Sequence, residues 1–327
     1  MVADRLASVV ALTKRHPRAL TAAQVLAFAV FLGFAAWAVH GDFSDAGRRL
    51  REASPIDFLV GCGVLAAYYL LFVVGWIKIL GDWGIVIHYG TALRAEMVSM
   101  LAKYIPGGVW TPAARVVAAR RAGITESGLV TASIFLEAGL SAVSGVIVFV
   151  ISLSWVKGVD APLLPLLAFG AVVAILIHPR IFQPLATRIL RRFGCSEVPP
   201  LRSATLVGLL VYYAFTWLVG GAALFFLVRA VGGDPDPATI PFLGGTSAVG
   251  AIVAVLSIFA PSGLGPREAS MYGLLLAVTS QGAALGATVL NRVAITIVEV
   301  GLLVVGGIVF RLRDEDERHR LAAEAET

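Results

Sequence analysis

The strongest constraint on this chain is a series of apolar runs, each long enough or nearly long enough to cross a lipid bilayer as a helix. Such a helix needs about 20 apolar residues to cross roughly 30 Å of hydrocarbon. The runs are continuous and lack the alternation of apolar and polar residues that barrel strands show. The sequence therefore predicts an all-α fold, a polytopic membrane helix bundle. About six full spans are expected, at 19–39, 57–80, 127–154, 162–178, 204–229 and 283–310.

The composition agrees with a membrane protein and excludes several other classes. Hydrophobic residues make up 58% of the chain and charged residues 14%, against about 25% charged in a soluble domain; the mean hydropathy is +0.86. The net charge of +5 is not accompanied by a basic arm interleaved with aromatic residues, so we expect no nucleic-acid partner. The first apolar run is longer than the core of a signal peptide, about 7–15 residues, and is expected to stay as a helix.

The positions of the basic residues predict which way the spans run. Lysine and arginine collect in 1–18, 113–123 and 178–203, and short cytoplasmic loops retain such residues. We therefore expect a plasma-membrane protein with both termini cytoplasmic. Its parts would be a cytoplasmic basic N-terminus (1–18), a single transmembrane domain (19–310) and a charged cytoplasmic tail (311–327).

Two regions between these spans, 85–121 and 240–281, are broken by proline and glycine. The first contains KYIPGGVWTPAAR, and the second contains APSGLGPREAS. Proline cannot continue a helix, and irregular backbone at membrane depth is tolerated only where protein or water satisfies it. We expect two re-entrant hairpins whose breaks line a polar cavity. The breaks comprise Pro106, Gly107, Gly108, Pro261, Ser262, Gly263 and Gly265. Plain loops, or full spans kinked at proline, are the open alternatives.

The two broken regions sit in equivalent settings of opposite orientation. Each follows one span and precedes another, so the chain divides into a first half at about 57–154 and a second half at about 204–310. Each final span carries one acid, Glu137 or Glu299. This pattern is typical of an inverted repeat, in which the substrate site lies between the halves.

Charged residues inside such a membrane domain are candidates for function. We expect Arg94, Arg115, Arg267 and Glu268 to bind substrate, with the arginines holding phosphate. Glu137 and Glu299 would balance charge or couple protons. Either acid could instead form a structural ion pair, with Arg267 or with Arg292, which lies two helical turns before Glu299. Ser262 can cap the helix that contains Arg267.

The sequence offers no conventional enzyme site. Its five histidines are scattered, its two cysteines lie far apart, and neither a nucleotide-binding nor a metal-binding motif is found. We therefore expect no catalytic residue, no metal, no cofactor and no enzymatic activity.

The two motifs KYIPGGVWTPAAR, continued by AARRAGIT, and APSGLGPREASMYG resemble the paired signatures of the lysylphosphatidylglycerol synthase transmembrane-region family. The resemblance covers about residues 15–312. It implies flipping of lipids, and stand-alone members accompany lipid-linked glycan or cell-envelope pathways. Ser262 stands where the family is expected to have glycine. No aminoacyl-transferase domain follows Phe310, so the synthase reaction is not implied. The matching positions are Pro106, Gly107, Arg115, Pro261, Gly263, Gly265, Arg267 and Glu268.

Together these features predict a lipid flippase or transporter for an anionic or polyprenyl-phosphate-linked lipid. Two rivals remain open, a membrane-embedded lipid-modifying transferase and a non-catalytic scaffold for envelope assembly. The expected partners are membrane lipids and envelope-biosynthesis enzymes. Gly282 and Gly286 form one pair of small residues with helical spacing, which is compatible with a homo-oligomer.

Overall fold

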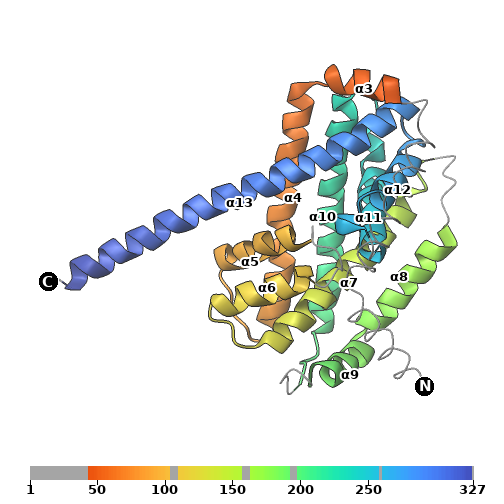
Figure 1. Cartoon of the computed structure of the whole chain (residues 1–327). Coiled ribbons are helices and arrows are strands. Elements are labelled where there is room, and N and C mark those ends of the chain that lie inside the picture. The colour runs from red at the N-terminus through yellow and green to blue at the C-terminus, as the bar shows by residue number, and fades with distance from the viewer. Residues whose placement is uncertain (1–42, 104–109, 157–162, 192–196, 258–259, 326–327) are drawn as a thin grey trace, which may run out of the picture.

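A computed structural model describes residues 43–103, 110–156, 163–191, 197–257 and 260–325 (Figure 1). In this part of the chain the regular structure is entirely helical, so the all-α prediction is confirmed. Five of the described helices are long and apolar enough to cross a membrane, and the protein is a multi-pass membrane protein. These helices are α4 (Pro55–Asp82), α7 (Ser127–Ser152), α10 (Ser203–Ala230), α11 (Ile240–Leu256) with the preceding turn η2 (Pro237–Thr239), and the Gln281–Gly306 part of α13 (Gln281–Ala325).

Three of the predicted spans coincide with α4, α7 and α10, and a fourth forms the first part of α13. The predicted span 19–39 and the basic segment 1–18 lie outside the described residues. α11 was expected to be one arm of a broken hairpin, yet with η2 it is long enough to be a span. The number of spans and the inverted repeat therefore stay predictions.

The predicted full span at 162–178 corresponds to the first helix of a bent pair, which together could form one span. The helix there, α8 (Leu163–Ile177), has only 15 residues. It meets α9 (Pro179–Leu190) at a bend of 72°. Proline follows His178, whose ring nitrogen Nδ1 accepts a hydrogen bond from the Arg180 amide at 3.3 Å. A new helix therefore begins here in a different direction, because proline at N1 starts a helix more readily than it continues one.

α13 continues beyond the predicted span 283–310 and runs as one helix to Ala325. The sequence after Phe310 contains neither proline nor glycine and is rich in strong helix formers. In Figure 1 the second part of α13 leaves the bundle.

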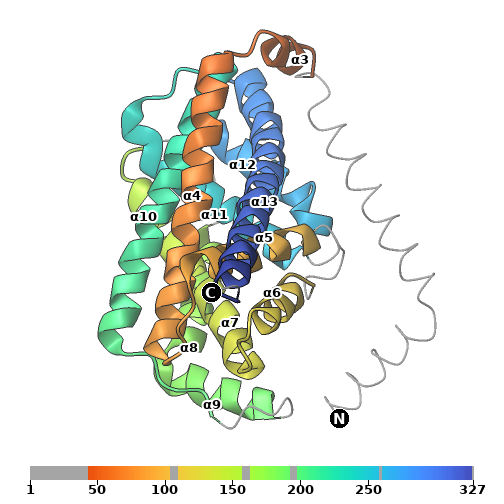
Figure 2. The same cartoon turned by 90° about the vertical axis from the view of Figure 1, so that its left-hand side faces the viewer.

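α10 packs against α4, α7, α11 and α13, and it runs alongside α4 in both views (Figures 1 and 2). The contact with α11 is a backbone contact between Gly221 and Gly244. A Cβ atom added to Gly221 would lie 2.8 Å from the Gly244 Cα, so any larger side chain would push the helices apart. Small residues that let backbones meet are the usual means of helix association in membranes.

The loops predicted to share one side of the membrane lie at one end of the bundle. The Ser54 amide, before α4, donates to the Ala230 carbonyl at the end of α10 at 2.8 Å. At the opposite end, Asp82, the last residue of α4, accepts from the Arg202 amide before α10 at 2.9 Å. In Figure 1 the short helix α3 (Phe43–Arg51) and α9 mark these two ends. Which end faces the cytoplasm stays a prediction.

The pair of small residues in α13 serves contacts within the chain. Gly282 leaves room for the Asp45 carboxylate of α3, and Gly286 lies against Val231. Asp45 in turn accepts hydrogen bonds from Arg49 at 2.7 Å and Arg48 at 2.6 Å. These two hydrogen bonds lower the pKa of the Asp45 carboxyl group.

Candidate functional site

Both broken regions form helical hairpins. In the first, α5 (Tyr89–Ala102) packs against α6 (Trp110–Arg121); in the second, α11 packs against α12 (Pro266–Leu275). The first hairpin begins at the end of the bundle marked by α9 and the second at the end marked by α3 (Figure 1).

The tips of the two hairpins meet. The Ser262 amide donates a hydrogen bond to the Lys103 carbonyl at 3.0 Å. The breaks predicted at Pro106, Gly107 and Gly108 lie outside the described residues. Whether the two breaks line a cavity therefore stays a prediction.

The second break has the backbone conformation that its glycines allow. Gly263 and Gly265 have φ angles of 67° and 93°, and Ser262, between Pro261 and Gly263, has a φ of 53°. Ser262 is the only residue other than glycine with a positive φ in the described part of the chain. The left-handed conformation is unfavourable for any residue with a Cβ atom, so this position favours the glycine expected there.

Ser262 does not cap α12, and that prediction is wrong. The N-cap is Gly265, and the Glu268 carboxylate accepts a hydrogen bond from the Gly265 amide at 2.6 Å. A cap must reach the first turn of its helix, and Ser262 lies four residues before Pro266, where the first turn starts. Glu268, predicted to bind substrate, therefore has a structural contact with its own helix end.

A first ion cluster, defined as Glu96, Arg115 and Glu137, lies between α5, α6 and α7. The Arg115 guanidinium forms ion pairs with both carboxylates, and the three residues are 8%, 4% and 2% exposed. One buried cation thus faces two carboxylates. The sequence singled out Arg115 and Glu137 but gave Glu96 no role.

Two aromatic residues complete the first ion cluster. The Arg115 guanidinium lies over the Trp76 ring of α4, 4.0 Å from its centroid. The Tyr213 hydroxyl of α10 donates to Glu137 at 3.2 Å. Tyr213 fits because Gly75 has no side chain at the point of contact. Arg94 does not belong to this cluster, since its side chain is exposed whereas Glu96, two residues later, is buried.

A second ion cluster, defined as Lys103, Arg267, Glu268, Arg292 and Glu299, lies where the hairpin tips meet. Lys103 of the first half forms an ion pair with Glu299 of the second, which is 3% exposed. The Tyr69 hydroxyl of α4 donates to the same carboxylate at 2.8 Å. Glu299 therefore pairs with Lys103, a partner that was not considered from the sequence.

The remaining ion pair of the second cluster is loose. Arg292 Nη1 lies 3.7 Å from Glu268 Oε1 and donates to the Ser262 carbonyl at 3.4 Å. Arg292 thus supports the tip of the second hairpin from α13.

Arg267 is the exception within the second ion cluster. Its side chain is half-buried and interacts electrostatically with Lys103 and Tyr69. No carboxylate within the described ranges lies at ion-pair distance from it. Neither acid considered as its partner, Glu137 or Glu299, is paired with it. The cluster holds three cations and two carboxylates, the reverse of the excess in the first cluster.

α4 contributes an aromatic residue to each ion cluster, Trp76 to the first and Tyr69 to the second. Tyr68 lies next to Tyr69 on the same helix. Its ring packs against Trp217 of α10, with the centroids 5.8 Å apart. One face of α4 therefore carries aromatic side chains past both clusters, a feature that the apolar pattern of 57–80 did not distinguish from ordinary core.

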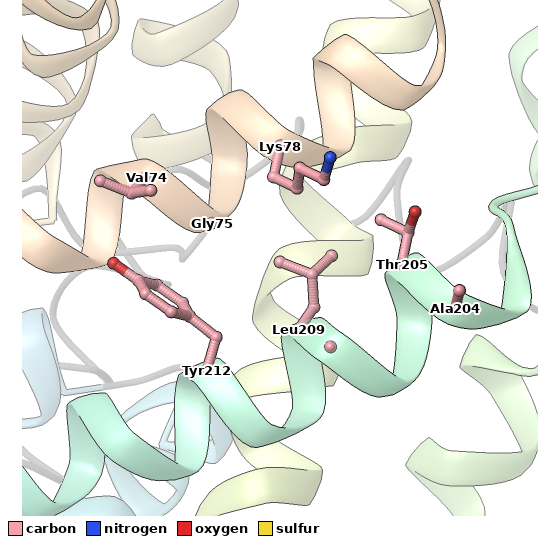
Figure 3. Close-up of a pocket in the computed structure, with 8 residues that line it drawn as sticks. Val74, Gly75, Lys78, Ala204, Thr205, Leu209 and Tyr212 are labelled. Carbon is pink, nitrogen blue, oxygen red and sulfur yellow. The ribbon is translucent and has the colours of Figure 1, made fainter.

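A separate pocket of about 410 Å³ lies between α4 and α10 (Figure 3). Lys78, Thr205 and Tyr212 are its polar residues, and Lys78 is exposed. None of its lining residues belongs to either ion cluster. As for metals, no group of three or more candidate side chains is found where the structure describes them.

The comparison with known families agrees with this arrangement. The family model described as "Lysylphosphatidylglycerol synthase TM region" matches residues 24–302. The match covers both hairpins and both ion clusters. No curated protein matches the chain. Because the family model covers most of the sequence, this chain belongs to the lysylphosphatidylglycerol synthase TM region family.

Proposed function

We propose that this protein is a lipid flippase or transporter that moves an anionic or polyprenyl-phosphate-linked lipid across the plasma membrane. It would act as a transporter and not as an enzyme. The headgroup would cross the bundle between the two hairpins while the acyl or prenyl tails stay in the bilayer. The family assignment supports a role connected with membrane lipids.

The observation that carries the proposal is Arg267 on α12, which has no carboxylate at ion-pair distance among the residues that the structure describes. A charged arginine within a membrane domain costs a few kcal/mol on insertion scales, and here no carboxylate of the described residues offsets it. Arg267 is the second residue of α12, where the helix end adds a partial positive charge. A phosphate group would offset both the charge of Arg267 and the partial charge of the helix end, and the planar guanidinium can bind two phosphate oxygens.

The second ion cluster offers a route from binding to movement. A phosphate held by Arg267 would compete with Glu299 for Lys103, which repels Arg267. The Lys103 carbonyl also accepts the hydrogen bond from Ser262 that joins the two tips. Exchange of Lys103 from Glu299 to phosphate would therefore loosen the contact between the hairpins.

The first ion cluster would then balance charge. Glu96 and Glu137 share one guanidinium, so the cluster has capacity for one proton. Proton uptake there is the form of coupling that this proposal favours for Glu137. Arg115, enclosed by its two acids, would hold α6 in place and contact phosphate only after an exchange of partners.

The test is lipid translocation in reconstituted vesicles. Purified Arg267→Ala and Arg267→Lys proteins would be compared with the unaltered protein, using vesicles that contain a headgroup-labelled phosphatidylglycerol. We expect Arg267→Ala to abolish translocation and Arg267→Lys to lower it partly, because lysine keeps the charge but lacks the planar guanidinium that binds two oxygens. Arg120→Ala, at an exposed arginine of α6, is the matched control and should transport normally.

Thermal unfolding of the same variants separates the outcomes. Normal translocation by folded Arg267→Ala would refute the phosphate site and favour a scaffold, in which the buried charges are dispensable. A chemically altered lipid recovered from the vesicles would favour the transferase. Unfolding of Arg267→Ala would assign Arg267 to the structure, and the activity of Arg267→Lys would then decide its role.

The proposed sidedness has its own test. Single cysteines at Arg188, on α9, and at Asp234, shortly after α10, replace exposed residues. α9 and the end of α10 lie at opposite ends of the bundle (Figure 1). A membrane-impermeant thiol reagent added to intact cells should label the cysteine at 234 and spare the one at 188. The reverse pattern would invert the proposed orientation and place both termini outside.

A further inference from the structure

The α8–α9 elbow lies apart from both ion clusters and has features of its own. α8 is strongly apolar, and the chain bends by 72° at Pro179 into α9. α9 is amphipathic and has 12 residues, too few to cross a bilayer. A helix of this kind at the end of an apolar one lies in the interface between lipid and water.

The polar face of α9 forms a basic pocket of about 720 Å³. Arg180, Arg188 and Arg191 line it, and all three are exposed. Its single acidic lining residue is Glu197. The pocket therefore carries an excess of arginine, the residue whose planar fork binds phosphate oxygens in pairs.

The opposite face of α9 covers an apolar groove of about 390 Å³ between α7, α8 and α9. Every residue that lines this groove is apolar. At its rim, Leu185 and Ile189 of α9 and Phe135 of α7 are 43%, 53% and 59% exposed. Gly139 of α7 also lines the groove, and its missing side chain lets Ile177 of α8 pack against α7.

The basic pocket and the apolar groove meet along one flank of α9. Arg188 lies three residues after Leu185, so these two side chains are neighbours on the helix surface. A cation therefore borders exposed apolar surface at the point where the groove opens. That juxtaposition matches a phospholipid, with a phosphate next to the start of its acyl chains.

We propose that the α8–α9 elbow binds one anionic phospholipid as a resident ligand, separate from any transported lipid. Arg188 and Arg191 hold its phosphate, and one acyl chain enters the groove under α9. The site is built from elements other than α12 and α13, which carry Arg267 and Glu299. It therefore does not depend on the proposed transport function.

The experiment is native mass spectrometry of delipidated protein titrated with phosphatidylglycerol or phosphatidylethanolamine. The protein should bind one phosphatidylglycerol more tightly than phosphatidylethanolamine. The combined variant Arg180→Gln, Arg188→Gln and Arg191→Gln should lose roughly fivefold in affinity for each arginine, which corresponds to about 1 kcal/mol for each basic residue near an anionic lipid. Arg120→Gln with Arg121→Gln, at exposed positions on α6, is the control and should bind normally.

A second variant tests the acyl chain. Ala186→Phe would fill the groove and should weaken phosphatidylglycerol binding several-fold, while inorganic phosphate should not compete at equal concentration. Equal binding of the two lipids would overturn the proposal, as would an unchanged affinity of the arginine variant. Unchanged binding by Ala186→Phe, or displacement of the lipid by phosphate, would show that the site binds a free anion and not a phospholipid. Arg267→Ala should keep this lipid, so the two proposals can fail separately.

Discussion

In the first half of the molecule the buried acid Glu137 is met by Arg115, which comes from the hairpin of that same half. In the second half the corresponding acid, Glu299, is met by Lys103, which comes from the hairpin of the other half. The cation in the second hairpin, Arg267, has no carboxylate at ion-pair distance within the described ranges. The two halves thus contain similar charged residues but pair them differently.

This difference assigns different roles to the two ion clusters. The first draws all three of its charged residues from its own half, has Arg115 stacked against Trp76 and is almost entirely buried. The second depends on the two halves being together and leaves a cation for a ligand. We therefore expect changes in the first cluster to affect folding, and changes in the second to affect the coupling of the hairpins and ligand binding.

The largest effect is expected from Arg115→Ala. It leaves Glu96 and Glu137 buried without their cation, and breaking a buried pair in this way costs about 3–5 kcal/mol. Arg267→Ala strands no carboxylate and should cost less than about 1 kcal/mol. Thermal unfolding of both variants in lipid nanodiscs measures the contrast. Similar losses in the two variants would show that the halves do not differ as described.

The next effect distinguishes the two acids. Glu299→Gln leaves Lys103 without its carboxylate; because the Lys103 side chain is 23% exposed, we expect a loss of about 2–3 kcal/mol, below the range for fully buried pairs. Glu137→Gln should cost less, since Arg115 still pairs with Glu96.

A double variant provides the control for the Glu299 prediction. Lys103→Met with Glu299→Met removes both charges and should regain most of the stability, as a double-mutant cycle would detect. A greater loss from Glu137→Gln than from Glu299→Gln would contradict the assignment of partners.

A smaller effect is expected from the two tyrosines that hold these acids. Tyr69→Phe removes a 2.8 Å hydrogen bond to Glu299 and should cost about 1.5 kcal/mol, the lower end for hydrogen bonds to charged groups. Tyr213→Phe removes a longer one of 3.2 Å to Glu137 and should cost about 1 kcal/mol. Chemical unfolding in mixed micelles can compare them, and the opposite order would show that distance does not rank the two bonds.

The smallest effect concerns the tip of the second hairpin and has the opposite sign. Ser262→Gly relieves a left-handed conformation at φ 53° that costs about 1–2 kcal/mol for a residue with a Cβ atom. Part of this gain is lost to the greater freedom of glycine in the unfolded chain, so we expect stabilisation by about 0.5 kcal/mol. Ser257→Gly, at φ −83°, is the control and should destabilise. A destabilising Ser262→Gly would show that the serine side chain is needed.

Much of the fold could be predicted from the sequence because hydrophobic length is a local property. The runs that became α4, α7 and α10 needed no knowledge of their neighbours. The bend at Pro179 was missed because the 17-residue stretch 162–178 met the length rule, although the proline next to His178 was a visible signal. The helical continuation of α13 was not considered because attention stopped at the apolar span, whereas Glu, Lys and Arg are good helix formers.

The candidate site could be predicted only in its residue types. Buried charges stand out in apolar sequence, so Arg115, Glu137, Arg267 and Glu299 were found. Their partners could not be, because Lys103 and Glu299 are 196 positions apart and meet only through the contact of two hairpin tips. Spacing along one helix favoured Arg292 as the partner of Glu299. Such spacing can identify only partners on the same helix, whereas Lys103 comes from a different hairpin.

α13 carries Glu299 at the second ion cluster and then continues without a break to Ala325. At about 1.5 Å per residue, its far end lies roughly 40 Å beyond Glu299. A straight helix behaves as a lever whose fulcrum lies where it is packed. A rotation of about 5° at Glu299 would displace the far end by roughly 3 Å. A change of ion partner inside the bundle would therefore produce a detectable movement of the helix end outside it.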